Sequence, residues 1–266
     1  MAELRGRRLS KRYSGLHVVH DVDVIVRPGE VLGYLGPNGS GKTTTARMLS
    51  GLLDPSNGVV EYDGRDIRAD LLSFRRRLGY IPEEPFLYPF LSGREYLELV
   101  GRLRELPARL LDDKIDGFLR LFNLATAADQ SIASYSKGMR QKIVISAALL
   151  HDPDVVIFDE PETGLDVTTT MMLRYLVRTL ASRGKAIMYS SHILEVVEKV
   201  CDRIIVLHKG KVVADDSIER LRSTLASNSL EGVFAQLVIR EDPEQLARDL
   251  ADLSAMGAPS ASLRAS

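Results

Sequence analysis

Residues 31–44 read Val-Leu-Gly-Tyr-Leu-Gly-Pro-Asn-Gly-Ser-Gly-Lys-Thr-Thr, an apolar run that passes directly into a glycine-rich loop. The run at 31–35 predicts a short strand. From Thr43 the apolar residues are spaced as in a helix, which Asp54-Pro55 and Asn57-Gly58 are expected to end. The residues with this spacing are Ala46, Met48, Leu49 and Leu52. A strand, a glycine loop and a helix in direct succession predict a phosphate-binding loop in an α/β fold.

The loop from Gly36 to Thr43 has the residue types that bind phosphate. Its glycines let backbone N–H groups turn inward around phosphate oxygens, and the N-terminus of the following helix adds partial positive charge. We expect Lys42 to hold the terminal phosphates of ATP, and Thr43 to offer its hydroxyl to Mg²⁺. The predicted ATP-binding residues of the loop are Gly36, Pro37, Asn38, Gly39, Ser40, Gly41, Lys42, Thr43 and Thr44.

A second chemically important position follows the apolar run at 155–158, where Asp159, Glu160 and Pro161 stand in succession. Acids at the C-terminal edge of a parallel sheet point into the crevice where ligands bind. We therefore expect Asp159 to hold Mg²⁺, and Glu160 to position the attacking water and take its proton. Together the two sites predict ATP hydrolysis, and they leave kinases, helicases and transporters as candidate classes.

The rest of the chain alternates strand and helix patterns around a segment at 86–150 that reads as mostly helical and as an insertion. Two apolar faces stand out in this segment: Tyr96, Leu97, Leu99, Val100 and Leu103, and then Ile115, Phe118, Leu119 and Phe122. Elsewhere the pattern predicts strands at 18–26, 31–35, 155–158 and 186–190, helices at 168–181 and 193–200, and a hairpin of 203–207 with 211–214. Short apolar runs that alternate with helices predict a mainly parallel sheet covered on both faces.

Composition and charge narrow the possible partners. The 266 residues include 35 Lys and Arg against 36 Asp and Glu, a formal net charge of −1, so no overall field favours nucleic acid or anionic lipid. Apolar stretches fall far short of the ~20 residues that span a bilayer, so any membrane role requires a partner. The single cysteine, Cys201, follows apolar residues and is expected in the core. Because no secretory signal begins at Met1, we expect a cytosolic protein.

The stretch Ser134-Tyr-Ser-Lys-Gly-Met-Arg-Gln141 opens an apolar helix upstream of Asp159. Serine caps a helix well, and a helix start with a serine hydroxyl and a flexible glycine forms a second anion site. With this helix in place, the chain resembles the nucleotide-binding subunit of an ATP-binding cassette transporter over residues 3–216. The specificity of the resemblance lies in the order and spacing of its elements.

The resemblance implies roles for an aromatic residue and a histidine. Tyr13 matches the residue that stacks on adenine, and His192, after Tyr189-Ser-Ser, matches the histidine that contacts the γ-phosphate. Without the resemblance Tyr13 would be interpreted as structural, and His192 equally well as a residue that caps a strand. The predicted catalytic residues are then Glu160, His192 and Lys42.

The resemblance also implies that a second subunit contributes to the site. Ser136, Lys137 and Gly138 occupy the place of the family signature that contacts the ATP of the partner subunit, and Ser136 and Gly138 match its invariant part; its commonest form is Leu-Ser-Gly-Gly-Gln. The departures from that form are Tyr135, Lys137 and Met139. Asp166, in Gly164-Leu-Asp, matches the loop that crosses the dimer interface. The two phosphate-facing positions, Ser136 and Gly138, retain the family's residue types.

The clearest departure from the family is Glu83, in Gly79-Tyr-Ile-Pro-Glu83, where most members place a glutamine that touches magnesium and senses the membrane partner. A carboxylate also accepts a hydrogen bond from metal-bound water, so we expect the same role. The predicted metal-binding residues are Thr43, Glu83 and Asp159. Together with the signature and the late Ser229-Leu-Glu-Gly-Val-Phe234, Glu83 is similar to the branch of bacterial exporters whose membrane subunit is a separate polypeptide.

The family fold is α/β, a P-loop NTPase (RecA-like) core with a mainly parallel sheet, an N-terminal antiparallel β subdomain and an inserted α-helical subdomain. Applied to this chain, the ATP-binding domain would span 1–217, with the helical subdomain inserted at about 86–152. Residues 218–266 would form a C-terminal extension that is partly helical. There we expect a weak amphipathic helix from Pro243, and a disordered tail over 257–266. The apolar residues of that helix are Leu246, Leu250 and Leu253.

In the family two such subunits, here expected to be two copies, face head to tail and enclose ATP, and hydrolysis lets them part. This cycle drives integral membrane permease subunits, so the resemblance implies a peripheral protein on the cytoplasmic face of the cell membrane that powers transport, in the direction of export. Membrane helices would dock between Glu83 and the helical subdomain. There the apolar stretch 85–91 is equally compatible with contacting them and with packing in the subdomain's own core.

Two alternatives belong to other classes. A soluble ATP switch of the same superfamily acts on ribosomes or DNA, but such proteins usually carry two cassettes or a long coiled coil, and this sequence has neither. A small-molecule kinase with a phosphate loop would lack the signature helix, the aspartate loop and the late histidine. The expected partners are therefore permease subunits and a second ATP-binding subunit, and no nucleic acid. The transported substance is not encoded here, because in this family the membrane subunits select it.

Overall fold

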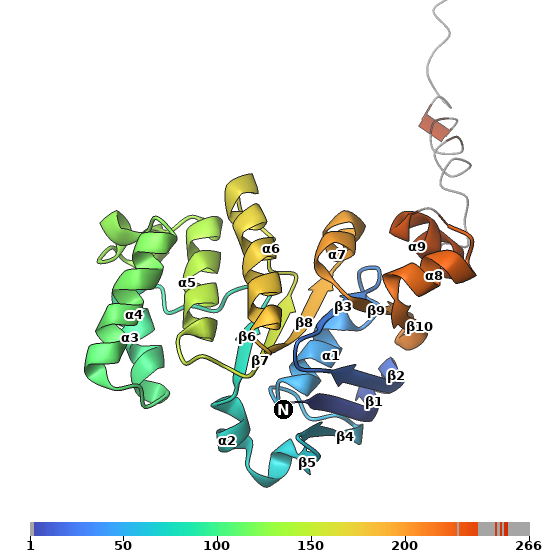
Figure 1. Cartoon of the computed structure of the whole chain (residues 1–266), viewed down its shortest axis with the longest axis horizontal. Helices are drawn as coiled ribbons and strands as arrows, with labels where there is room; N and C mark the ends of the chain where they lie inside the picture. Colours follow the sequence, from blue (N-terminus) through green and yellow to red (C-terminus); the bar gives the residue numbers. More distant parts are fainter. Residues whose placement is uncertain (1–2, 228, 239–247, 249–250, 252, 255–266) are drawn as a thin grey trace, which may run out of the picture.

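Among the residues that the structure describes (3–227, 229–238, 248, 251 and 253–254), a six-stranded, mainly parallel sheet runs through the centre of the molecule (Figure 1). In this computed structural model the strand order is β10-β9-β3-β8-β7-β6. The strands are β3 (Val31–Leu35), β6 (Leu78–Ile81), β7 (Val155–Asp159), β8 (Ala186–Ser191), β9 (Arg203–His208) and β10 (Lys211–Ser217). Among them β10 alone is antiparallel to its neighbour, as the predicted hairpin requires.

A second sheet is antiparallel and comes from the first part of the chain. Its order is β2-β1-β4-β5 among the described residues. The strands are β1 (Leu4–Tyr13), β2 (Leu16–Val26), β4 (Asn57–Tyr62) and β5 (Arg65–Asp66). The two sheets confirm the predicted fold class, an α/β core with an N-terminal antiparallel β subdomain.

Helices cover both faces of the parallel sheet, and a group of three lies beyond its β6 edge (Figure 1). That group, green in Figure 1, is the predicted inserted helical segment: α3 (Gly93–Leu103), α4 (Ala108–Leu121) and α5 (Lys137–Leu149). The other α-helices are α1 (Lys42–Leu49), α2 (Leu71–Arg75), α6 (Val167–Ser182), α7 (Leu194–Val200), α8 (Ile218–Thr224) and α9 (Leu230–Val238). Single 3₁₀ turns, η1 to η3, lie at Ile67–Ala69, Ala125–Ala127 and Ile132–Ser134.

The central strands are apolar at successive positions because both of their faces are buried. In β7, Val156 and Phe158 face a core layer with the helices α5, α6 and α7. Val155 and Ile157 face the other layer, which contains α1 and the antiparallel sheet. Successive side chains of a strand point to opposite faces, so each layer takes every second residue. The buried Cys201 belongs to the first layer, as predicted, and burial raises the pKa of its thiol.

The first helix is shorter than the sequence predicts. It ends at Leu49, and Gly51 follows with a φ of 66°, in the left-handed region that ends helices and favours glycine. Leu52, predicted to lie on the buried face, is 58% exposed. The glycine therefore ends the helix before the Asp54-Pro55 signal is reached.

The apolar face of α3 is also narrower than predicted. Leu97 is fully buried, but Leu99 and Leu103 are exposed, the latter by 72%. The buried positions are Gly93, Leu97 and Gly101, at intervals of one helical turn, and the predicted Tyr96 and Val100 are partly buried against the core. A Cβ on Gly101 would lie 2.2 Å from a methyl carbon of Leu111, so the glycine is what lets α4 pack this closely.

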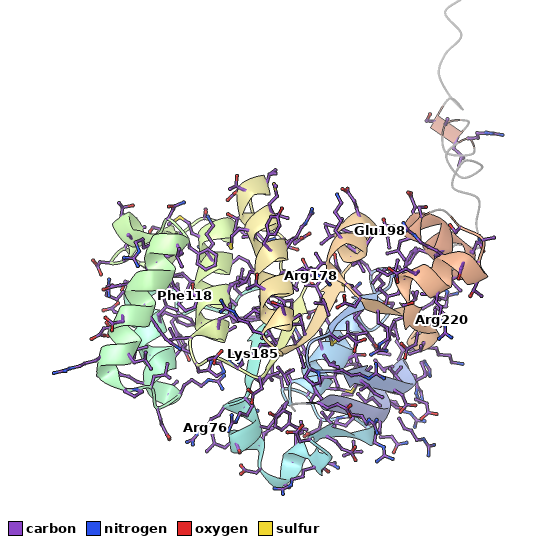
Figure 2. All side chains as sticks on the ribbon, in the orientation of Figure 1. Arg76, Phe118, Arg178, Lys185, Glu198 and Arg220 are labelled. Carbon is purple, nitrogen blue, oxygen red and sulfur yellow. The ribbon has the colours of Figure 1, made fainter. Side chains whose placement is uncertain are left out.

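Charge pairs connect the outer helices to their neighbours. Arg178 of α6 lies 2.6 Å from Asp202, and Glu198 of α7 pairs with Arg222 of α8 (Figure 2 labels Arg178 and Glu198). Such partly exposed pairs stabilise a fold by at most about 1 kcal/mol each, so apolar burial holds these helices.

Two further expectations concern the C-terminal part of the chain and membrane spans. Within the predicted helix from Pro243, Leu246 and Leu250 lie outside the described residues, as does the tail over 257–266. Leu253 is described and is 65% exposed. In the part of the chain that is described, no helix has the length and apolar character needed to cross a bilayer.

Candidate functional site

The strand order places three chemically important strand ends side by side. β8 lies between β3 and β7, so the ends of all three meet at one edge of the sheet (Figure 1). The glycine loop follows β3, Asp159 ends β7, and His192 follows β8. The carboxyl edge of a parallel sheet is where α/β proteins bind ligands.

The glycine loop is shaped by two close approaches of backbone. Gly41 precedes α1 with a φ of 107°, and a Cβ there would lie 2.9 Å from the carbonyl oxygen of Val18. A Cβ on Gly36 would lie 2.3 Å from the carbonyl oxygen of Leu207. Larger side chains at these positions would displace the backbone. The N-terminus of α1 has no side-chain cap, so its N–H groups remain available to an anion.

Lys42 and Glu160 form a buried ion pair at the centre of this edge. Lys42 Nζ lies 3.2 Å from Glu160 Oε1 and donates to the carbonyl oxygen of Gly36 at 2.8 Å. Nδ1 of His192 lies 2.7 Å from Glu160 Oε2. The Lys42 and Glu160 side chains are 5% and 9% exposed. The structure thus brings all three predicted catalytic residues together in one chain of contacts.

The backbone holds Glu160 in an unusual conformation. Its φ is 49°, in the left-handed region that residues with a side chain rarely adopt. Its N–H donates to the carbonyl oxygen of Ser190 on β8 at 3.0 Å. The chain therefore turns sharply after Asp159, which directs the Glu160 carboxylate toward Lys42.

Asp159 has a different partner for each carboxylate oxygen. Thr43 Oγ1 donates to Oδ1 at 3.4 Å, and the Tyr80 hydroxyl donates to Oδ2 at 3.2 Å. Burial raises the pKa of Asp159, hydrogen bonding by the Tyr80, Ser190 and Thr43 side chains acts against that rise, and the charge of Glu160 adds to it. The Thr43 hydroxyl and the Asp159 carboxylate are hard oxygen ligands brought together from two elements, and they fit a divalent cation such as Mg²⁺.

Glu83 and Tyr13 lie nearer the surface than the central residues. Glu83 follows β6 and is partly exposed, and among the described residues no hydrogen bond or ion pair joins it to Thr43 or Asp159. Tyr13 ends β1 and is 45% exposed, with Lys11 Nζ 5.5 Å from its ring centroid. An exposed aromatic ring beside a cation is a surface on which a base can stack.

The predicted signature residues start α5, away from the glycine loop. Ser136 caps the helix by accepting from the Met139 N–H at 3.2 Å, and both Ser136 and Lys137 are exposed. A Cβ on Gly138 would lie 2.8 Å from the carbonyl oxygen of Gly164, so this glycine lets the helix approach the loop before α6. Within the described chain, no hydrogen bond or ion pair joins residues 136–138 to the glycine loop.

The loop that carries Asp166 is tied to the same helix. Asp166 caps α6, accepting from the Thr169 N–H at 2.8 Å and from its hydroxyl at 2.7 Å, and Lys142 of α5 lies 3.5 Å away. These hydrogen bonds, followed by the charge of Lys142, lower the pKa of Asp166 to about 2. Gln141 Nε2 donates to the Pro161 carbonyl oxygen at 3.3 Å. Residues 160–166 and the start of α5 therefore form one connected unit.

The contact that sequence reasoning misses is that of Tyr80 with Asp159. The apolar residues around Tyr80 are compatible with a strand, but its closeness to Asp159 depends on β6 lying next to β7. The residues Leu78 to Ile81 carry a sequence signal for the strand β6, but no local signal indicates that β7 is its neighbour.

Comparisons with known proteins agree with this geometry. A family model described as "ABC transporter" matches residues 19–163. The chain is 37% identical over 235 residues to the ABC transporter ATP-binding protein NatA of Bacillus subtilis, which covers 88% of this chain and 96% of that protein. It is 34% identical over 215 residues to the Nod factor export ATP-binding protein I of Burkholderia lata, and the match covers 81% of this chain and 71% of that protein. A solved structure of the ATP binding subunit of an ABC transporter matches with a TM-score of 0.83 at 33% identity, covering 88% of this chain and 98% of that one.

Proposed function

The chain belongs to the ABC transporter family as an ATP-binding subunit, and from that premise we propose that it hydrolyses ATP to ADP and phosphate to power transport. The observation that carries the proposal is the contact chain of Lys42, Glu160 and His192, in which the buried Glu160 carboxylate has Lys42 at one oxygen and the more exposed His192 at the other. A phosphate-binding cation and a carboxylate base are the two groups that hydrolysis of a phosphoanhydride requires.

The proposed mechanism assigns one step to each residue. Lys42 and the backbone N–H groups of the glycine loop hold the β- and γ-phosphates, whose charge replaces that of Glu160 as the partner of Lys42. Glu160 then accepts a proton from the water whose oxygen attacks the γ-phosphorus, while the bond to the β–γ bridging oxygen breaks. His192 holds the Glu160 carboxylate and contacts the γ-phosphate. Mg²⁺ held by Thr43 and Asp159, with Glu83 as a further candidate ligand, would neutralise charge on the phosphates.

We further propose that two copies of the chain share each ATP. Ser136, Lys137 and Gly138 are exposed or partly exposed at the start of a 13-residue helix, with the N-terminal charge and donors that suit a phosphate. Among the residues that the structure describes, no hydrogen bond or ion pair joins them to the glycine loop, so a second copy, related by a two-fold axis, is the natural source of the ATP they bind. Asp166 would lie at the same interface.

The membrane partner would dock beside Glu83. Phe86, Tyr88 and Phe90 follow it and are 85%, 53% and 76% exposed, whereas Leu87 between them packs on the core. Tyr88 also lies near α3, with its ring centroid 6.3 Å from that of Tyr96. For Phe86 and Phe90, which are the most exposed, contact with a partner is the interpretation we favour. We propose integral membrane subunits as that partner, which would hold the protein at the cytoplasmic face of the membrane. Export as the direction is suggested by the name of the Burkholderia relative.

We also propose that the chain consists of an ATP-binding domain and a C-terminal extension. An ATP-binding domain over 1–217, containing the helical subdomain at about 86–152, would carry the site. Residues 218–266 would form an extension, of which α8 and α9 are described and pack near α7.

Glu160→Gln tests the assignment directly. The amide keeps the shape of the side chain but accepts no proton, so we expect ATP binding to persist and turnover to fall by at least about a hundredfold. Size-exclusion chromatography with ATP and Mg²⁺ should show the variant accumulating as a dimer. The matched control is Glu195→Gln, the same change at an exposed position on α7. A Glu160→Gln protein that hydrolyses ATP at the native rate, or stays monomeric with ATP, would show that the role is wrong.

A further inference from the structure

Tyr80 and Asp159 lie on neighbouring parallel strands and on the same face of the sheet. Tyr80 of β6 is in register with Ile157 of β7, and Asp159 comes two residues later. Side chains two residues apart on a strand share a face, so the phenol reaches along the sheet to the end of β7. Its hydroxyl donates to Asp159 Oδ2 at 3.2 Å.

This hydrogen bond divides the two oxygens of the carboxylate between different tasks. Oδ2 is held by Tyr80 on the side of the sheet, while Oδ1 lies 3.4 Å from Thr43 Oγ1 on the side of the glycine loop. Asp159 is 1% exposed, so its rotation is restricted by the groups around it. Without a donor on Oδ2, the carboxylate could turn about its terminal bond, because that torsion is broad.

We propose that Tyr80 is a positioning residue for the metal site, which holds Oδ2 of Asp159 so that Oδ1 faces the Mg²⁺ of bound Mg·ATP beside Thr43. The inference rests on the proposed function, since it takes Mg·ATP as the ligand. Groups that hydrogen bond to a metal ligand orient it, and their removal commonly weakens metal affinity by 10- to 100-fold. Tyr80 itself contacts neither the nucleotide nor the metal in this account.

The chain offers a matched control at the other end of β7, the strand that Asp159 ends. Tyr62 donates to Asp154 Oδ2 at 3.1 Å, just before β7 begins, so it repeats the tyrosine–aspartate contact far from the glycine loop. Tyr80→Phe and Tyr62→Phe each remove one hydroxyl from a partly buried phenol. A general effect of losing such a hydrogen bond should therefore be similar in the two variants, and an effect on metal binding should be confined to Tyr80→Phe.

The test measures binding rather than turnover. Full-length protein, Tyr80→Phe and Tyr62→Phe are titrated with a fluorescent ATP analogue in EDTA, and then with Mn²⁺ in the presence of ADP, with free Mn²⁺ followed by electron paramagnetic resonance. We expect Tyr80→Phe to bind nucleotide normally in EDTA and to bind Mn²⁺ about tenfold more weakly. Tyr62→Phe should match the native protein in both titrations. Thermal unfolding of each variant shows whether it folds.

The outcomes separate this inference from the proposed function. Unchanged Mn²⁺ affinity in folded Tyr80→Phe, or an equal loss in Tyr62→Phe, would overturn the positioning role while leaving ATP binding intact. If Tyr80→Phe does not fold, Tyr80→His supplies a ring with a donor, and native Mn²⁺ affinity restored by it would support the role, whereas a weakened affinity would contradict it. A native protein that binds no nucleotide in either titration would instead contradict the proposed function itself.

Discussion

The glycine loop and the signature helix differ in the contacts that their functional side chains make within one chain. At the loop, Lys42 has Glu160 within 3.2 Å and both side chains are buried. At the signature helix, Ser136 and Lys137 are exposed, and the serine hydroxyl caps its own helix. In the described part of the chain, the predicted catalytic residues Glu160 and His192 thus lie in contact with the first helix start or with each other, whereas no hydrogen bond or ion pair connects them to Ser136 or Lys137. We infer that each chain supplies two unlike halves of a site, and that the second half requires another copy.

The strongest effect is expected where the contacts are most buried. Lys42→Ala should abolish measurable ATP hydrolysis, with a loss of at least about a hundredfold, because it removes the cation that holds the phosphates. It also leaves Glu160 buried without its partner, which should cost about 3 kcal/mol of stability. Fluorescent-ATP titration and urea unfolding measure the two effects. Lys199→Ala, in an exposed pair on α7, is the control.

A second substitution sharpens this comparison. Lys42→Ala combined with Glu160→Gln removes the uncompensated charge, so part of the lost stability should return while activity stays absent. Unchanged ATP affinity in Lys42→Ala would contradict the role of the loop. An additive stability loss in the double variant would show that the two side chains are not energetically coupled.

The smallest effect is expected at Asp166, in the loop over 160–166 that connects the glycine-loop site with the signature helix. The pKa of Asp166 is lowered from its ordinary value near 3.8 to about 2, so its charged form is favoured by the fold. A lowered folded-state pKa adds stability that is fully present above the unfolded value and is lost as pH falls through the folded one. Asp166→Ala should therefore be less stable than the native protein at neutral pH, by an amount that stays constant down to about pH 4 and shrinks toward pH 2.

Urea unfolding at several pH values measures that difference. Asp166→Asn is the matched control, because asparagine caps a helix as well as aspartate but carries no charge. Its stability should lie between those of the native protein and Asp166→Ala at neutral pH. A gap between the native protein and Asp166→Ala that widens below pH 4 would contradict the assignment.

Sequence predicts the parts of this site that are local. The strand, loop and helix at 31–49 and the apolar run before Asp159 carry their own signals, because glycine, lysine and carboxylate positions are fixed within a few residues. These elements occur in the structure where they are expected, except that α1 ends at Leu49, before the predicted stop at Asp54-Pro55. The contact of Glu160 with His192, in contrast, depends on β7 and β8 being neighbours, which no local pattern specifies.

The parts that sequence does not predict depend on packing between elements. Tyr80 meets Asp159 because β6 lies beside β7, which no local pattern specifies. The narrow buried face of α3 depends on how closely Gly101 lets α4 approach. The same holds for 85–91, where sequence left two interpretations open: Phe86 and Phe90 are exposed, whereas Leu87 packs on the core. Hydrophobic character alone does not show which side of a helix or loop its neighbours cover.

The most direct test of the two-chain site mixes two inactive variants. Lys42→Ala disables the glycine loop, and Ser136→Asp keeps a good helix cap while placing a carboxylate where the partner's phosphate would lie. Each variant alone should be inactive. In an equal mixture, about half of the pairs contain one copy of each variant. Each mixed pair has two sites, of which one combines an intact loop with an intact signature helix. About a quarter of the native activity should therefore return. A mixture no more active than its two components would contradict the account, because it would mean that no site is shared between chains.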